Sequence, residues 1–204
     1  MTGVLGAYRV VELGDGVASA VLGMLLADQG AEVVKVEPPT GDPLRGQPVF
    51  SVWNRGKKSL VLDPASDRDA RIGAAMVKSS DVLVESRDSR YPDAFTISYE
   101  AATNLNEGIV YLSLPGFGEG HPQAGLEAWE EVLGAYTGIY TDRSQDGSAG
   151  PSFISLPHAS IFGAMVAAPA IIAALIHRTR TGRGQQVTVP LFDAMYTAMG
   201  SHLV

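Results

Sequence analysis

Four groups of polar residues have types and spacing that could do chemistry, and the first is a turn of small residues near the amino terminus. Gly14-Asp15-Gly16 follows an apolar run, and Glu37 ends the next apolar run. In dinucleotide-binding proteins such a turn sets phosphates against helix amides, and the acid binds ribose. Ser19 stands at the third glycine position, and Asp15 brings a negative charge toward the phosphates. This degenerate pattern fits either a dinucleotide site or a structural turn.

The second group is basic. Arg55, Lys57 and Lys58 lie close together, with Arg45 upstream, in an otherwise acidic chain. Clustered cations of this kind bind phosphate groups, but a solvated turn before a strand has the same composition. The spacing supports both interpretations equally.

The third group is His158 and Ser160, which precede an apolar helical pattern. A nucleophilic serine needs a base within hydrogen-bond reach and an oxyanion pocket, and an aspartate could complete such a hydrolase site. Two residues that are two apart at a helix start usually point in different directions. We therefore favour the alternative, in which Ser160 or His158 caps the helix.

The fourth group is the carboxylate pair Glu130 and Glu131, directly after Trp129. Adjacent residues of a helix diverge by about 100° around its axis, so the pair cannot form one acid/base dyad. We expect one carboxylate to face a pocket and the other to face water.

The elements that must position these groups alternate between strand and helix, which predicts an α/β fold with a mostly parallel sheet. The β-branched or apolar runs that predict strands are 8–13, 32–37, 58–62, 81–85, 109–114 and 186–190. The helical patterns are 18–29, 65–79, 98–105, 126–137, about 159–178 and the segment after 193. Loops are expected at 40–47, 86–93, 116–125 and 142–152.

Composition narrows the class of protein. The chain has no cysteine, which excludes disulfide scaffolds, thiolate metal sites and cysteine nucleophiles. A formal net charge of −7 disfavours nucleic acid or an anionic membrane as partner. The longest uncharged apolar run, 161–176, is too short for a bilayer and contains Gly163 and Pro169, so we expect a buried helix. With no secretory signal pattern, the expected location is the cytoplasm.

Taken together, six segments resemble the class III CoA-transferase family, which includes formyl-CoA transferase, carnitine CoA-transferase and α-methylacyl-CoA racemase. In order, they are RVVELG at 9–14, MLLADQGAEVVKVEPPTGDPLRG at 24–46, NRGKKSLVLD at 54–63, DVLVE at 81–85, IVYLSLPGFG at 109–118 and RTRTGRGQQVTV at 178–189.

The resemblance implies that residues 1–204 form the amino-terminal part of a Rossmann-like large domain, lacking the family's small domain. It implies coenzyme A or acyl-CoA as substrate, with no metal. The chain stops within an apolar helical pattern, whose face needs cover. The implied partner is a homologous chain or a missing carboxyl-terminal half, in an interlocked dimer.

Family chemistry passes the acyl group through an aspartate. Counting back from Thr181 by the family spacing places that position at Ser160, and pinning the alignment on Gly163 places it at Ala159. Neither is a carboxylate. Trp129 stands at the position of the racemase histidine, and Glu130 stands at the family's acidic position near the thioester.

For the cofactor, the resemblance implies contacts from six residues: Gly16, Val17, Arg45, Lys57, Lys58 and Ser86. Ser86 replaces the asparagine that usually follows the DVLVE strand. The leading hypothesis is a component of an acyl-CoA:carboxylate CoA-transferase that supplies its CoA-binding domain. The alternatives are a non-catalytic half that partners an active homologue, and a racemase-like or dinucleotide-binding domain.

Overall fold

The computed structural model describes residues 3–86, 96–126, 129–140 and 150–199. Six strands form one sheet in the order β3-β2-β1-β4-β5-β6, and every pair is parallel. Their bounds are β1 Arg9–Gly14, β2 Glu32–Glu37, β3 Lys58–Val61, β4 Val82–Ser86, β5 Val110–Ser113 and β6 Gln185–Thr188. The predicted α/β class is confirmed. Parallel strands bring all their carboxyl ends to one edge of the sheet, where ligands of open α/β sheets bind.

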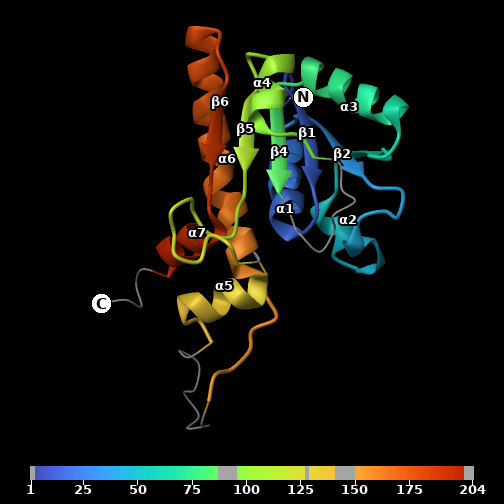
Figure 1. Ribbon diagram of the computed structural model, residues 1–204. Helices are drawn as coiled ribbons and strands as arrows, with labels where there is room; N and C mark the ends of the chain where they lie inside the picture. Colours follow the sequence, from blue (N-terminus) through green and yellow to red (C-terminus); the bar gives the residue numbers. More distant parts are fainter. Residues whose placement is uncertain (1–2, 87–95, 127–128, 141–149, 200–204) are drawn as a thin grey trace.

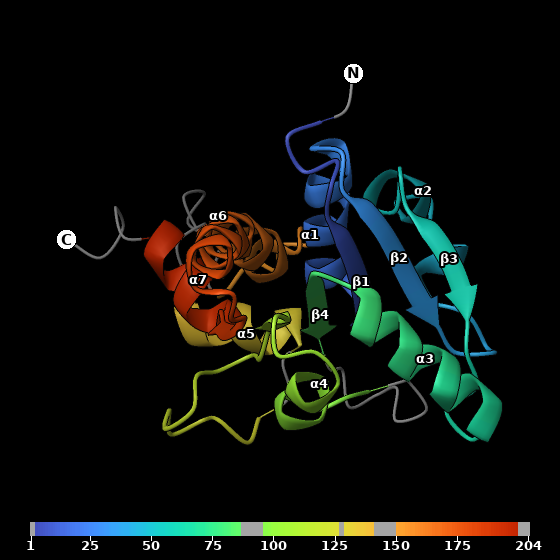
Figure 2. The same ribbon diagram turned by 90° about the horizontal axis from the view of Figure 1, so that it is seen from above.

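Helices cover both faces of the sheet, as Figure 2 shows from above. Their bounds are α1 Val17–Asp28, α2 Phe50–Trp53, α3 Asp67–Ser79, α4 Tyr99–Leu105, α5 Glu130–Thr137, α6 His158–Thr181 and α7 Leu191–Ala198, with a 3-10 turn, η1, at Pro43–Gly46. One apolar cluster joins α1, α6 and α7 to one face, and another joins α3 and α4 to the opposite face.

The β-branched strands give this sheet its two-faced core. In β1, Val10 packs toward α1 and α6 while Val11 packs toward α3 and α4, and both are buried. Val82 and Leu83 of β4 divide in the same way. This alternation follows from the two-residue period of a strand, and burial on both faces is typical of a parallel sheet.

Two predicted helices begin elsewhere in the structure, and one helix was not predicted. The helix expected from residue 126 begins only at Glu130, because Trp129 has extended backbone angles (φ −70°, ψ 139°) and precedes the first helical turn. The last helix begins at Leu191 rather than after residue 193, directly behind Pro190. The short α2 lies in a stretch for which the sequence predicted no helix. The loops expected at 87–93 and 142–149 lie outside the described residues.

Helix α6 is the longest element and lies alongside α1 (Figure 1). Its inner face is made largely of small side chains, including Ala164, Ala167 and Ala174, which lets the two helices approach closely. Its outer face is apolar as well: Met165, Val166, Ile172 and Ile176 are 40–57% exposed. The expectation of a fully buried helix is therefore wrong for this face.

The same helix meets the length and composition of a membrane span, with 24 residues and a mean hydropathy of 2.2 over its most apolar window. It also packs on α1, α5 and α7 as part of the core. A core helix passes the same test, so length and composition alone do not make it a membrane helix.

Candidate functional site at the carboxyl edge of the sheet

The turn from β1 into α1 lies at the carboxyl edge and is open on one side. Gly16 has a φ of 95°, a conformation that side chains with a Cβ rarely adopt, and it begins helix α1. A Cβ built on Gly16 would meet no atom within 4 Å. Gly14 is the last residue of β1, and it pairs with Ser86 at the end of β4. The structure thus brings Gly16, Val17 and Ser86 to one open region of the edge.

Glu37, which the sequence offered as a ribose-binding acid, is engaged within the protein. Its carboxylate accepts hydrogen bonds from Arg45 Nε at 2.5 Å, Arg45 Nη2 at 2.6 Å, Ser59 Oγ at 2.6 Å and the Asp42 amide at 3.1 Å. Burial alone would raise the pKa of Glu37, but the bonds from Arg45, Ser59 and Asp42 outweigh it and lower the pKa. The carboxylate of Glu37 is therefore not free to bind a ribose, which the dinucleotide interpretation requires.

Four charged side chains form a buried network beneath this edge, which the sequence did not predict. Lys35 Nζ contacts Glu12 Oε1 at 3.0 Å, Asp42 Oδ2 at 2.8 Å and the Gly14 carbonyl at 2.9 Å. Lys57 Nζ contacts the second oxygen of Glu12 at 2.7 Å. Two ammonium groups and two carboxylates balance their charges, as buried ions must. The network ties the β1 turn to the loop after β2.

The basic residues do not form one phosphate site. The side chain of Lys57 is only 2% exposed, and besides Glu12 it bonds Asn54 and the carbonyl of Ala20. Lys58 is exposed at the opposite, amino-terminal edge, where it pairs with Glu32. Arg45 stays at the carboxyl edge, half exposed, with its guanidinium bound to Glu37 and stacked on Phe50. A shared approach of these three cations to one phosphate does not fit this arrangement.

Glu130, at the start of α5, reaches the amino terminus of α6. Its Oε1 accepts the Ala159 amide at 2.6 Å, and its Oε2 accepts the Ser160 amide at 3.1 Å and Ser160 Oγ at 2.8 Å. Burial raises the pKa of Glu130, opposed by the bonds from Ser160 and Ala159 and by the nearby His158. Glu131 is exposed, so the two carboxylates face different surroundings, as expected.

The prediction that Ser160 or His158 caps α6 was wrong. No side chain within α6 caps it, and Pro157 holds the N-cap position. Glu130 caps the helix from α5 instead, which satisfies two amides that would otherwise have no partner. His158 Nδ1 contacts the Leu156 carbonyl at 3.0 Å rather than Ser160, so a Ser–His pair is not assembled. The Ser160–Glu130 contact joins residues 30 positions apart and has no local sequence signal.

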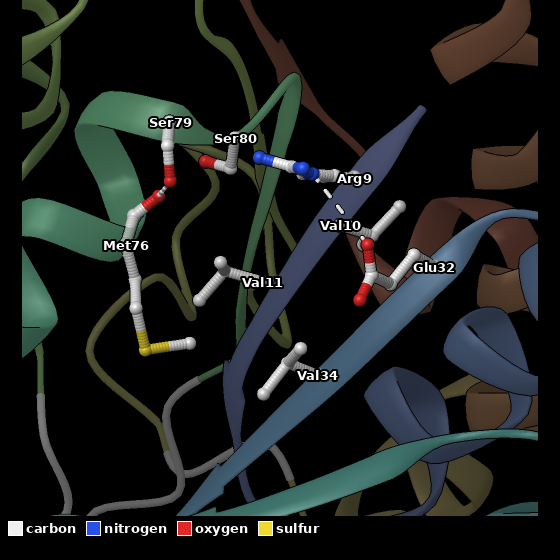
Figure 3. Close-up of a pocket in the computed structure, with 8 residues that line it drawn as sticks. All are labelled: Arg9, Val10, Val11, Glu32, Val34, Met76, Ser79 and Ser80. Atoms are coloured by element: carbon white, nitrogen blue, oxygen red, sulfur yellow. Dashed lines mark hydrogen bonds and ion pairs between the residues drawn. The ribbon is translucent and has the colours of Figure 1, made fainter. Parts of the chain in front are cut away.

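A small cavity of about 190 Å³ lies at the other end of the strands (Figure 3). Its floor is apolar, with Val11, Val34 and Met76, and its rim carries the Arg9–Glu32 ion pair. It lies at the amino-terminal edge, away from Gly16 and Ser160. Within the described stretches, groups of three or more His, Asp or Glu side chains that could hold a metal are absent.

Comparisons with known proteins show the family of this chain. Residues 5–204 match the model of CoA-transferase family III. The chain is 34% identical over 211 residues to a succinyl-CoA:mesaconate CoA-transferase of Haloarcula hispanica, covering 95% of this chain and 53% of that protein. It is 34% identical over 206 residues to a formyl-CoA:oxalate CoA-transferase of Streptomyces avermitilis, covering 96% and 49%.

A crystal structure of a CAIB/BAIF family protein from Brucella suis is similar throughout, with a TM-score of 0.87 and 29% identity, covering all of this chain and 57% of that one. The chain therefore spans about half the length of the relatives it matches. The family match covers residues 5–204, which include the open turn at Gly16 and the turn between α6 and β6. The chain belongs to CoA-transferase family III.

Proposed function

We propose that this chain supplies the CoA-binding part of an acyl-CoA:carboxylate CoA-transferase. The observation that carries the proposal is the open first turn: Gly16 leaves free space at the carboxyl edge, in a chain of this family. CoA is an elongated nucleotide thioester, and such ligands lie across the carboxyl ends of parallel strands. Gly16, Val17 and Ser86 surround the opening, and Arg45 is a predicted cation that lies at the same edge with a half-exposed side chain.

Lys57 and Lys58 have other roles in this proposal. Lys57 supports the fold beside the site, because it neutralises the buried carboxylate of Glu12 in β1. Lys58, at the opposite edge, does not contact the cofactor. No metal takes part. The names of two relatives, a succinyl-CoA:mesaconate and a formyl-CoA:oxalate CoA-transferase, support small acyl-CoA thioesters and carboxylic acids as the substrate class.

The rest of the molecule comes from a second large-domain chain or a carboxyl-terminal half. The support is the apolar outer face of α6, where four large side chains are exposed, together with the half-length coverage of the relatives. Exposed apolar stripes of this kind mark protein interfaces. We propose an interlocked dimer in the cytoplasm as the complete form.

The second candidate function is a non-catalytic half that binds an active homologue. Ser160 favours it, because a serine hydroxyl cannot form the mixed anhydride that a carboxylate forms. A racemase-like activity is disfavoured by Trp129 at the histidine position, and a dinucleotide site is disfavoured by the occupied carboxylate of Glu37.

Calorimetric titration with CoA and, separately, with NAD tests the proposal. We expect CoA to bind and NAD not to bind. Gly16→Ala places a methyl group in the opening and strains the turn, so the Kd for CoA should rise about tenfold or more. Gly182→Ala is the matched control. Gly182 also has a positive φ of 76° and open space around it, but it lies at the carboxyl end of α6 and not at the turn into α1. Failure of CoA to bind the wild-type chain would refute the proposal.

A further inference from the structure

The carboxylate of Glu130 touches the two residues at which the family's aspartate can be placed. Aligned on Thr181 that position is Ser160, and aligned on Gly163 it is Ala159. Glu130 Oε1 lies 2.6 Å from the amide of Ala159, and Oε2 lies 3.1 Å from the amide of Ser160. One carboxylate therefore contacts both candidate positions, whichever alignment is used.

An aspartate in place of Ser160 would bring its carboxylate close to that of Glu130, because Ser160 Oγ already lies 2.8 Å from Glu130 Oε2. Glu130 reaches this place from the neighbouring helix. The carboxylate absent from α6 is replaced, in position and in chemical type, by one from α5.

We propose that Glu130 is the nucleophile of this chain, in place of the aspartate. The inference rests on the proposed function, because a bound acyl-CoA must supply the thioester. Glu130 is half-buried rather than enclosed, so a thioester can approach it. Its raised pKa, caused by burial, indicates a carboxylate that is less stabilised than one in water.

The chemistry balances without a further reactant. A Glu130 oxygen attacks the thioester carbonyl, the C–S bond breaks, and CoA leaves as the thiolate while a glutamyl acyl anhydride forms. The thiolate then attacks the δ-carbonyl of Glu130, which releases the acyl group as a carboxylate and leaves a glutamyl-CoA thioester. An acceptor carboxylate reverses both steps, and CoA leaves on the acceptor.

The three donors around Glu130 suit the second step. When the thiolate adds to the δ-carbonyl, negative charge develops on the glutamyl oxygen. The amides of Ala159 and Ser160 and the Ser160 hydroxyl already lie 2.6–3.1 Å from the carboxylate oxygens, which is the distance at which donors stabilise such an oxyanion. Ser160 thereby acts as a donor and not as the nucleophile.

Trapping with hydroxylamine tests the inference. The chain is incubated with acetyl-CoA or succinyl-CoA, treated with hydroxylamine and digested, and the peptides are examined by mass spectrometry. We expect a hydroxamate on Glu130. Glu130→Gln should reduce this label about 100-fold or more, whereas Glu131→Gln, a change of the same type at the exposed neighbour, should leave it unchanged.

A double variant guards against the objection that Glu130→Gln only disturbs the helix cap. Glu130→Gln with Ser160→Asp restores a carboxylate on α6, and the label should move to residue 160. CoA binding is measured in parallel by calorimetry. Binding of CoA without a label on Glu130 overturns the inference and leaves the non-catalytic half standing, whereas loss of CoA binding overturns the proposed function as well.

Discussion

At the scale of single residues, the protein keeps several charges inside by surrounding each with partners. Glu37 is 1% exposed, and four donors meet its two oxygens. Glu12 is fully buried between two lysines. An unpaired carboxylate in either place would be strongly destabilising, so the partners Arg45, Lys35 and Lys57 stabilise the fold.

This arrangement predicts a pH dependence of stability. The pKa of folded Glu37 lies below its ordinary value of 4.5, so its ionised form stabilises the fold above pH 4.5. That contribution is lost as the pH falls through the lowered folded value. Glu37→Gln should reduce the free energy of unfolding by about 2 kcal/mol at pH 7, and the difference from wild type should shrink in acid.

Urea unfolding between pH 7 and pH 3 measures this effect, with Glu131→Gln as an exposed control expected to stay close to wild type at every pH. A constant difference between Glu37→Gln and wild type over the whole range would contradict the assignment.

At the scale of elements, the turn from α6 into β6 uses two glycines for different reasons. Gly182 ends α6 in the left-handed region, with a φ of 76°. Gly184 has no such φ, but a Cβ on it would lie 1.9 Å from the carbonyl oxygen of Ile109. The first glycine supplies a backbone conformation, and the second lets the turn lie directly against the start of β5.

We therefore expect Gly184→Ala to be the more damaging change. The added methyl group meets backbone, which can move only by shifting the strand, so the loss should be about 3 kcal/mol. Gly182→Ala should lose about 1 kcal/mol through its positive φ. Gly46→Ala, where a Cβ meets open space, should change stability by less than about 0.5 kcal/mol. Thermal and urea unfolding rank the three, and equal losses at Gly182 and Gly184 would argue against the packing explanation.

At the scale of the whole molecule, the outer face of α6 is an exposed apolar surface to which a partner could bind. Met165, Ile172 and Ile176 recur at helical spacing on that face, and Val166 is exposed beside them. The same helix packs its inner face into the core, so charged residues on the outer face should leave the fold intact.

Ile172→Glu with Ile176→Glu should abolish association of the chain with itself or with its partner half, while circular dichroism stays that of the wild type. Sedimentation velocity over a range of concentrations measures the association. Val4→Glu is the control, because Val4 is 88% exposed and lies outside α6. Unchanged association in the double variant would show that α6 is not the interface.

The sequence by itself determined the α/β class and the order of most elements, because strand and helix periodicity and turn glycines are local signals. The resemblance of six segments indicated the family. The tertiary structure decided which chemical groups meet. Lys57 and Lys58 are neighbours in sequence but lie in the core and on the surface, since successive residues entering a strand point in opposite directions. Glu130 and Ser160 are 30 positions apart, and only the packing of α5 on α6 brings carboxylate and hydroxyl to 2.8 Å.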